Sequence, residues 1–267
     1  MLADSHLHSQ YSFDSQELME NQVKRAIDIG LPVMCFTDHI DWDFPMPEMI
    51  FDYDMEQYME EISTLQDRYE KQVRILKGVE LGMQTQLGDR YRELLQQYPF
   101  DYAISSQHLV DGKDPYYPQV FEEYGDALVF QKYFEETYEN LRLFHEGNTL
   151  GHLDYVVRYG QNGASEYNYR RYGEIIDEIL KLMIRYDIAL EVNSAGIRKG
   201  LGFPNPHPDV IRRYRELGGK LITVGSDAHV SEDLAKNFIL VEQILKTLGF
   251  QETCYYVNRS PVFLKIQ

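Results

Sequence analysis

The chain has 267 residues, of which 43 are acidic and 26 basic, so its formal net charge is −17. Hydrophobic residues make up 43% and charged residues 26%, a composition typical of globular proteins that excludes intrinsic disorder and fibrous repeats. The acidic charge also argues against a general nucleic-acid binder, because such proteins neutralise phosphates with Lys and Arg.

Short β-rich runs alternate with longer helical stretches along the chain. The predicted strands are Leu2–Asp4, Val33–Thr37, Arg74–Val79, Tyr102–Ser106, Asn148–Gly151, Ile188–Asn193 and Leu221–Gly225. The predicted helices between them are 16–30, 55–72, 87–97, 130–145, 170–186, 208–217 and 234–249. This alternation predicts βαβ units and a parallel sheet, and about seven units favour a closed α/β barrel. An open doubly wound sheet is the alternative, but no G-x-G-x-x-G follows the first strand.

The cysteines and the apolar runs indicate the compartment. Cys35 and Cys254 both lie in apolar runs, so we expect buried thiols in a reducing environment. No apolar run reaches the roughly 18 residues needed to cross a bilayer, and the first residues lack the pattern of a signal peptide. We therefore expect a cytoplasmic protein without a membrane partner.

Most of the histidines fall where predicted strands end. Six of the eight lie at or just beyond the C-terminal end of a strand, and so do Glu80 and Asp227; the six are His6, His8, His39, His108, His152 and His229. In a parallel barrel these ends converge on one face, where active sites are built.

Each of these groups has an ordinary structural explanation when it is considered alone, as a turn, a helix cap or a packed side chain. Together, so many imidazoles and carboxylates at one face would be costly through desolvation and repulsion unless cations neutralised them. His and carboxylate ligands suit Zn, Mn or Fe rather than Mg or Ca. The sequence therefore predicts a multinuclear metal site.

The motifs occur in a fixed order: His6-x-His8, Thr37-Asp38-His39, Gly78-x-Glu80, isolated His108 and His152, and Ser226-Asp227-Ala228-His229. Together they resemble the four-motif pattern of the PHP (polymerase and histidinol phosphatase) superfamily, and within it the histidinol-phosphate phosphatase branch. The resemblance covers essentially the whole chain. It implies a distorted (β/α)7 TIM-like barrel, a single domain over residues 1–267, that holds three divalent transition-metal ions (Zn, Mn or Fe).

The resemblance also implies a distribution of ligands. The first metal would take His6, His8, Glu80 and Asp227, and the second would take Glu80, His108 and His152, with Glu80 bridging. The third would take Asp14, His39 and His229. Many family members have a histidine where this chain has Asp14, whereas the histidinol-phosphatase branch resembles this chain in using aspartate. Asp14 could equally cap the helix that follows it.

The activity implied by this resemblance is hydrolysis of L-histidinol phosphate to L-histidinol and inorganic phosphate, a step of histidine biosynthesis. Our mechanistic hypothesis is in-line attack on phosphorus by a metal-bridging hydroxide. The chain has no G-x-S-x-G elbow and no P-loop, which favours direct attack by water over a covalent intermediate. The alternatives are another PHP phosphoesterase, either a phosphotyrosine phosphatase or a 3′ exonuclease, or a noncatalytic metal-binding PHP module.

Phosphate also needs cationic partners, and Arg suits it through bidentate hydrogen bonding. Arg158 and Arg198 follow two of the predicted strands and are candidate phosphate clamps, with surface ion pairing as the alternative. His207, in a Pro-rich loop, is a candidate to contact phosphate or protonate the leaving oxygen, or else a rigid loop position. The acidic and aromatic segment 41–54 reads either as a lid over a cationic amino alcohol or as an ordinary surface loop.

Overall fold

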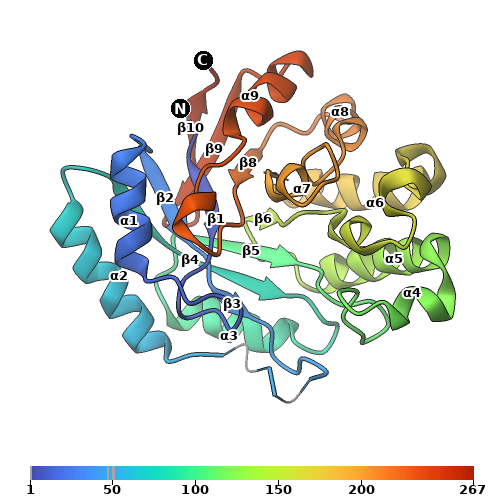
Figure 1. Cartoon of the computed structure of the whole chain (residues 1–267), viewed down its shortest axis with the longest axis horizontal. Helices are drawn as coiled ribbons and strands as arrows, with labels where there is room; N and C mark the ends of the chain where they lie inside the picture. Colours follow the sequence, from blue (N-terminus) through green and yellow to red (C-terminus); the bar gives the residue numbers. More distant parts are fainter. Residues whose placement is uncertain (1, 47, 50–51) are drawn as a thin grey trace.

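A parallel sheet curls into a barrel with helices on its outer surface (Figure 1) in the computed structural model, which describes residues 2–46, 48, 49 and 52–267. The strand order is β1-β2-β4-β5-β6-β7-β8, with the short β3 paired to β4. The strands are β1 Asp4–Leu7, β2 Val33–Phe36, β3 His39–Ile40, β4 Arg74–Gly82, β5 Tyr102–Ser106, β6 Thr149–Leu150, β7 Ala189–Asn193 and β8 Ile222–Gly225.

The barrel nearly closes between its first and last strands. The backbone N–H of Asp227 donates to the carbonyl of His6 at 2.8 Å, and the N–H of His8 donates to the carbonyl of Ala228 at 2.8 Å. The pairing is parallel throughout this sheet. The predicted distorted (β/α)7 barrel is therefore confirmed.

The helices that pack around the barrel are α1 Met19–Asp28, α2 Met55–Tyr69, α3 Gly88–Gln97, α4 Gln119–Tyr124, α5 Asp126–Leu143, α6 Tyr169–Arg185, α7 Ala195–Arg198, α8 Pro208–Glu216 and α9 Phe238–Thr247. Three short 3₁₀ turns, Tyr155–Tyr159, Gly163–Glu166 and Ser231–Asp233, lie in the loops after strands. The N-caps follow local rules: Asp54 accepts from the N–H of Gln57 before α2, and Asn168 accepts from the N–H of Arg171 before α6.

The first helix begins later than the sequence predicts. The sequence predicts a start at residue 16, with Asp14 as a possible cap, but α1 begins at Met19 and its N-cap is Leu18. Residues 9–18 instead form a loop held by hydrogen bonds from the backbone N–H and hydroxyl of Ser9 to Asp38 at 2.6 and 2.9 Å. This loop leaves Asp14 available to the cluster of histidines.

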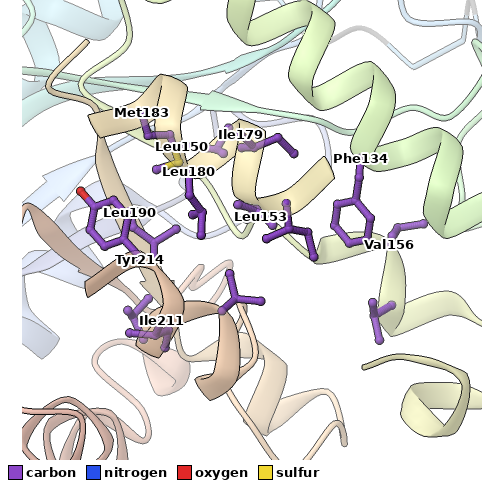
Figure 2. Close-up of a cluster of buried hydrophobic side chains, with 14 of the residues drawn as sticks. Phe134, Leu150, Leu153, Val156, Ile179, Leu180, Met183, Leu190, Ile211 and Tyr214 are labelled. Carbon is purple, nitrogen blue, oxygen red and sulfur yellow. The ribbon is translucent and has the colours of Figure 1, made fainter. Parts of the chain in front are cut away.

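The largest hydrophobic core lies between the barrel and the helices that cover β6, β7 and β8. Figure 2 shows apolar side chains of α5, α6 and α8 meeting Leu150 of β6 and Leu190 of β7. In α6, the buried Ile176, Ile179 and Met183 recur at helical spacing, as an amphipathic helix requires. This packing holds the strands from which the site is built.

A C-terminal hairpin, β9 Glu252–Val257 and β10 Ser260–Lys265, was not predicted from the sequence. It packs against the N-terminal ends of the barrel strands, where Tyr256 stacks on Tyr102 at 5.4 Å between ring centroids. Cys35 and Cys254 are free and buried in the same cluster, as expected. No helix in the described part of the chain has the length and apolar character to cross a membrane.

Candidate metal centre

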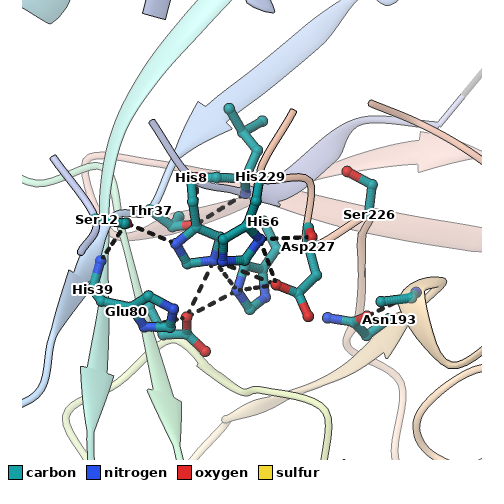
Figure 3. A network of polar contacts seen from close by, with 12 residues as sticks. His6, His8, Ser12, Thr37, His39, Glu80, Asn193, Ser226, Asp227 and His229 are labelled. Atoms are coloured by element: carbon teal, nitrogen blue, oxygen red, sulfur yellow. Dashed lines mark hydrogen bonds and ion pairs between the residues drawn. The ribbon is translucent and has the colours of Figure 1, made fainter. Parts of the chain in front are cut away.

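All nine residues predicted to bind metal lie together at the C-terminal end of the barrel. Figure 3 shows how His6, His8, His39, Glu80, Asp227 and His229 face one another. They come from the ends of β1, β3, β4, β5, β6 and β8 and from the loop before α1. The strand pairing places them in register, because His39 of β3 lies directly opposite Glu80 of β4. Asp227 has a left-handed φ of 54°, a conformation that Asp tolerates better than most residues.

The first ligand group surrounds one point. Nε2 of His6 lies 3.0 Å from Nε2 of His8 and 3.0 Å from Oε2 of Glu80. Oδ1 of Asp227 lies 3.5 Å from Nε2 of His8 and 3.9 Å from Nε2 of His6. Two ring nitrogens and two carboxylate oxygens therefore converge, which is a donor set for a divalent cation.

The second and third groups adjoin the first. Oε1 of Glu80 lies 3.0 Å from Nε2 of His152 and 3.3 Å from Nε2 of His108, so Glu80 faces both the first and the second group. Oδ2 of Asp14 lies 3.1 Å from Nε2 of His229 and 3.9 Å from Nε2 of His39. Asp14 therefore contacts the histidine cluster and does not cap a helix.

The electrostatics of the cluster match a site made for cations. Burial alone would raise the pKa of the Glu80 carboxyl, but His6, His39 and His108 hold that pKa well below its usual value. Burial, together with His229 and His39, lowers the pKa of His8 to about 3, so this ring stays neutral. Burial would lower the pKa of His6 and of His108, but the carboxylates of Glu191 and Asp41, together with Glu80, hold both pKa values well above the usual value, so these rings carry positive charge beside Glu80. A divalent ion would take the place of that charge, because histidine binds a metal ion as the neutral imidazole.

Hydrogen bonds on the far nitrogen orient four of the rings. In each, Nδ1 contacts an oxygen and leaves Nε2 facing the centre: His6 on Glu191 at 2.6 Å, His8 on the hydroxyl of Ser12 at 3.1 Å, His108 on Asp41 at 2.6 Å, and His229 on the carbonyl of Asp227 at 3.1 Å. Metal-binding histidines are typically oriented in this way. The residues present therefore fit divalent metal ions.

The sequence did not identify the two carboxylates that orient these rings, Glu191 and Asp41. Glu191 is fully buried within β7, and its second oxygen accepts from the N–H of His152 at 2.7 Å and the side chain of Asn193 at 3.2 Å. Asp41 also lies 3.3 Å from Nδ1 of His39. A charged residue inside an otherwise apolar predicted strand was the available signal for Glu191.

Arg158 and Arg198 both line a cavity of about 500 Å³ that opens over the cluster. Arg158 donates to Asn205 at 2.8 Å, to Asp227 at 3.2 Å and to Asn193 at 3.3 Å. Arg198 donates to Asp233 at 2.9 Å and to the carbonyls of Ser226 and Asp227. Both guanidinium groups are thus fixed in place at the cavity wall.

His207 lies elsewhere. It is the N-cap of α8, where its Nδ1 accepts from the N–H of Asp209 at 3.2 Å. Its own N–H donates to Asp154 at 2.8 Å, and its ring packs on Phe203 at 4.6 Å. It is not among the described residues that line the cavity. Of segment 41–54, Asp41, Phe44 and Met49 do line it, whereas residues 47, 50 and 51 lie outside the described residues.

Several known proteins are similar to this chain. A histidinol-phosphatase of Lactococcus lactis is 31% identical over 93% of this chain and 92% of its own length. A Clostridium acetobutylicum protein named probable histidinol-phosphatase is 31% identical over 99% of this chain and 97% of its own length.

One solved structure matches nearly the whole molecule. The L. lactis histidinol phosphate phosphatase, crystallised with zinc, L-histidinol and phosphate, has a TM-score of 0.90, is 29% identical, and aligns over 98% of both chains. The family model for the PHP domain matches residues 4–195, which include every predicted metal ligand except Asp227 and His229. The chain therefore belongs to the PHP domain family.

Proposed function

We propose that this protein is a metal-dependent histidinol-phosphatase, which hydrolyses L-histidinol phosphate to L-histidinol and inorganic phosphate. The observation that carries the proposal is the match over 98% of the chain to a phosphatase crystallised with zinc, L-histidinol and phosphate. The convergence of imidazoles and carboxylates beneath a cavity supports it, since this chemistry suits phosphate esters. The same activity would place the chain in histidine biosynthesis.

We infer that three divalent ions occupy the cluster in the groups already described. His6, His8, Glu80 and Asp227 would hold the first; Glu80, His108 and His152 the second; and Asp14, His39 and His229 the third. The nitrogen-rich donor set favours a transition metal such as Zn, Mn or Fe. Bound ions of this kind lower the pKa of water to about 7 and neutralise charge on the phosphoryl oxygens.

The side chains of this protein would then bind and orient the ester. Arg158 and Arg198 project from the cavity wall on the side of Asp227, and we propose that they contact the phosphoryl oxygens. Their own hydrogen bonds fix both guanidinium groups before substrate arrives, which lowers the entropy lost on binding. For His207, we propose a structural role at the start of α8, because of its capping contact there.

The test is phosphate release from L-histidinol phosphate, measured beside p-nitrophenyl phosphate, a phosphotyrosine peptide and single-stranded DNA. We expect a strong preference for L-histidinol phosphate that is lost on chelation and restored by zinc or manganese. If phosphate is released only from the other esters, L-histidinol phosphate is not the substrate, but the protein is still a metal-dependent phosphoesterase. No turnover by metal-loaded protein would instead favour the noncatalytic module.

A further inference from the structure

The cavity above the metal ligands is lined by several carboxylates, and nearly all of them are paired. Asp14 contacts His229, Asp41 contacts His108, Asp227 contacts Arg158, and Asp233 contacts Arg198; the distances are 3.1, 2.6, 3.2 and 2.9 Å. Asp114 also lines the cavity, and within the described residues it forms no ion pair with Lys, Arg or His. One carboxylate at the cavity wall therefore lacks an ion-pair partner among the described residues.

The loop fixes the position of this carboxylate. Oδ1 of Asp114 accepts from the N–H of Tyr116 at 2.8 Å, and its carbonyl accepts from the N–H of Tyr117 at 3.2 Å. Pro115, between them, is buried and restricts the backbone further. Only one carboxylate oxygen is used by the described protein, so the other can receive a donor from a ligand.

Aromatic rings connect the metal ligands to this carboxylate. The ring of Tyr155 lies 4.9 Å from that of His152 and 5.7 Å from that of His108. Tyr159 follows at 5.1 Å from Tyr155, and Tyr116 at 6.0 Å from Tyr159. These tyrosines form a continuous wall that runs from the metal cluster to the exposed Tyr116, beside Asp114.

A tyrosine wall ending at an uncompensated carboxylate suits an organic cation. Aromatic faces attract cations, and a partly buried carboxylate binds an ammonium or imidazolium through a charge-assisted hydrogen bond. Two acidic side chains of segment 41–54 are paired otherwise, since Asp41 contacts His108 and the exposed Asp43 contacts Arg90 at 3.3 Å. Of the described acidic residues of this segment, Asp41 alone lines the cavity.

We propose that Asp114, with Tyr155, Tyr159 and Tyr116, is the subsite that selects phosphate esters whose leaving group carries a positive charge. This inference rests on the proposed function, because it assumes that the phosphoryl group lies over the metal ligands. It assigns Asp114 to the ammonium or imidazolium of the amino alcohol and the tyrosines to its apolar surface. Asp114 is thus a specificity-determining residue.

The experiment compares two enzymes on two kinds of substrate. We expect Asp114→Asn to lower kcat/KM for L-histidinol phosphate about 10- to 100-fold, the range for losing a hydrogen bond to a charged group. The fall for p-nitrophenyl phosphate, which has no cation, should be at least about tenfold smaller. With the analogue of L-histidinol phosphate that lacks the amino group, the difference between the two enzymes should shrink if the ammonium is the group bound.

Asp111→Asn is the matched control, because Asp111 lies on the same loop, is exposed and pairs with Lys132 at 3.2 Å outside this cavity. Asp111→Asn should keep kcat/KM for both substrates within about twofold of the wild-type values. An equal fall for Asp114→Asn on cationic and neutral esters would overturn the proposal, as would no fall on either.

Failure of the proposed function gives a different result. If the wild-type enzyme does not hydrolyse L-histidinol phosphate, 2-aminoethyl phosphate and ethyl phosphate replace it as the cationic and neutral pair. If the wild-type enzyme prefers the aminoethyl ester and Asp114→Asn removes that preference, the Asp114 subsite is supported, whereas L-histidinol phosphate is rejected as the substrate. If the wild-type enzyme shows no preference for a cationic ester, both the subsite and the proposed substrate are rejected.

Discussion

Replacing Glu191 with glutamine tests how the metal cluster is held. Glu191 accepts through both oxygens: Oε1 from Nδ1 of His6 at 2.6 Å, and Oε2 from the N–H of His152 at 2.7 Å and the side chain of Asn193 at 3.2 Å. Glutamine has one acceptor oxygen and one NH₂ group, so it cannot satisfy all three donors.

Both orientations of the new amide are unfavourable. If its oxygen stays on His6, the NH₂ group faces the N–H of His152, and an unsatisfied buried donor costs about 1–3 kcal/mol. If the amide turns, its NH₂ faces Nδ1 of His6, which must then accept. The proton of that ring would move to Nε2, the atom that faces the other ligands, and His6 could not bind a metal ion.

We therefore expect Glu191→Gln to weaken metal affinity about 10- to 100-fold, which corresponds to roughly 1.4–2.8 kcal/mol. The assay is metal content after dialysis against graded chelator, with phosphatase activity measured on the same samples. Asp101→Asn is the control, since this buried carboxylate accepts from the N–H groups of Lys77 and Asn258 away from the metal cluster. Metal retention by Glu191→Gln equal to that of the wild type would refute the reasoning.

Three further predictions follow from the structure. Gly225→Ala would place a methyl group against His6 and the Glu191 carboxylate, so metal content and turnover should fall at least about tenfold, whereas Gly173→Ala in α6 should leave both unchanged. Burial raises the pKa of Glu136 to about 7, so the folded chain retains a proton there and its stability falls as pH rises from about 4.5 to 7. Glu136→Gln should therefore raise the free energy of unfolding near pH 8 by on the order of 1 kcal/mol, after allowance for solvent screening, and should change it little near pH 4. Thermal unfolding at the two pH values is the measurement, and equal effects at both would contradict this prediction. Chelation should lower the unfolding temperature, and added zinc should restore it to an extent that depends on the zinc concentration. The reason is that a ligand that binds only the folded state stabilises it by mass action. An unfolding temperature that chelation leaves unchanged would argue against a metal cluster.

The alternation of strands and helices, and the site residues at the strand ends, could be predicted because both depend on local patterns. Apolar runs such as Val33–Phe36 and Ile222–Gly225 form strands in any parallel barrel, and the residues that follow them must reach its C-terminal mouth. The family motifs then related residues far apart in sequence, such as His6 and Asp227. The start of α1 was less well predicted, because it depends on long-range contacts of the preceding loop, residues 9–18, with Asp38.

The sequence by itself determined the alternation of barrel strands and helices and indicated which histidines and carboxylates would gather at the strand ends, since periodicity and strand ends are local properties of the chain. The tertiary structure alone decided which carboxylate accompanies which cation. Asp227 faces Arg158 and His8, Glu191 orients His6, and Asp114 forms no ion pair within the described part of the chain, although all three are simply acidic residues in the sequence. The physical reason is that ion pairing and burial depend on distances between side chains from different strands and loops, and folding alone sets those distances.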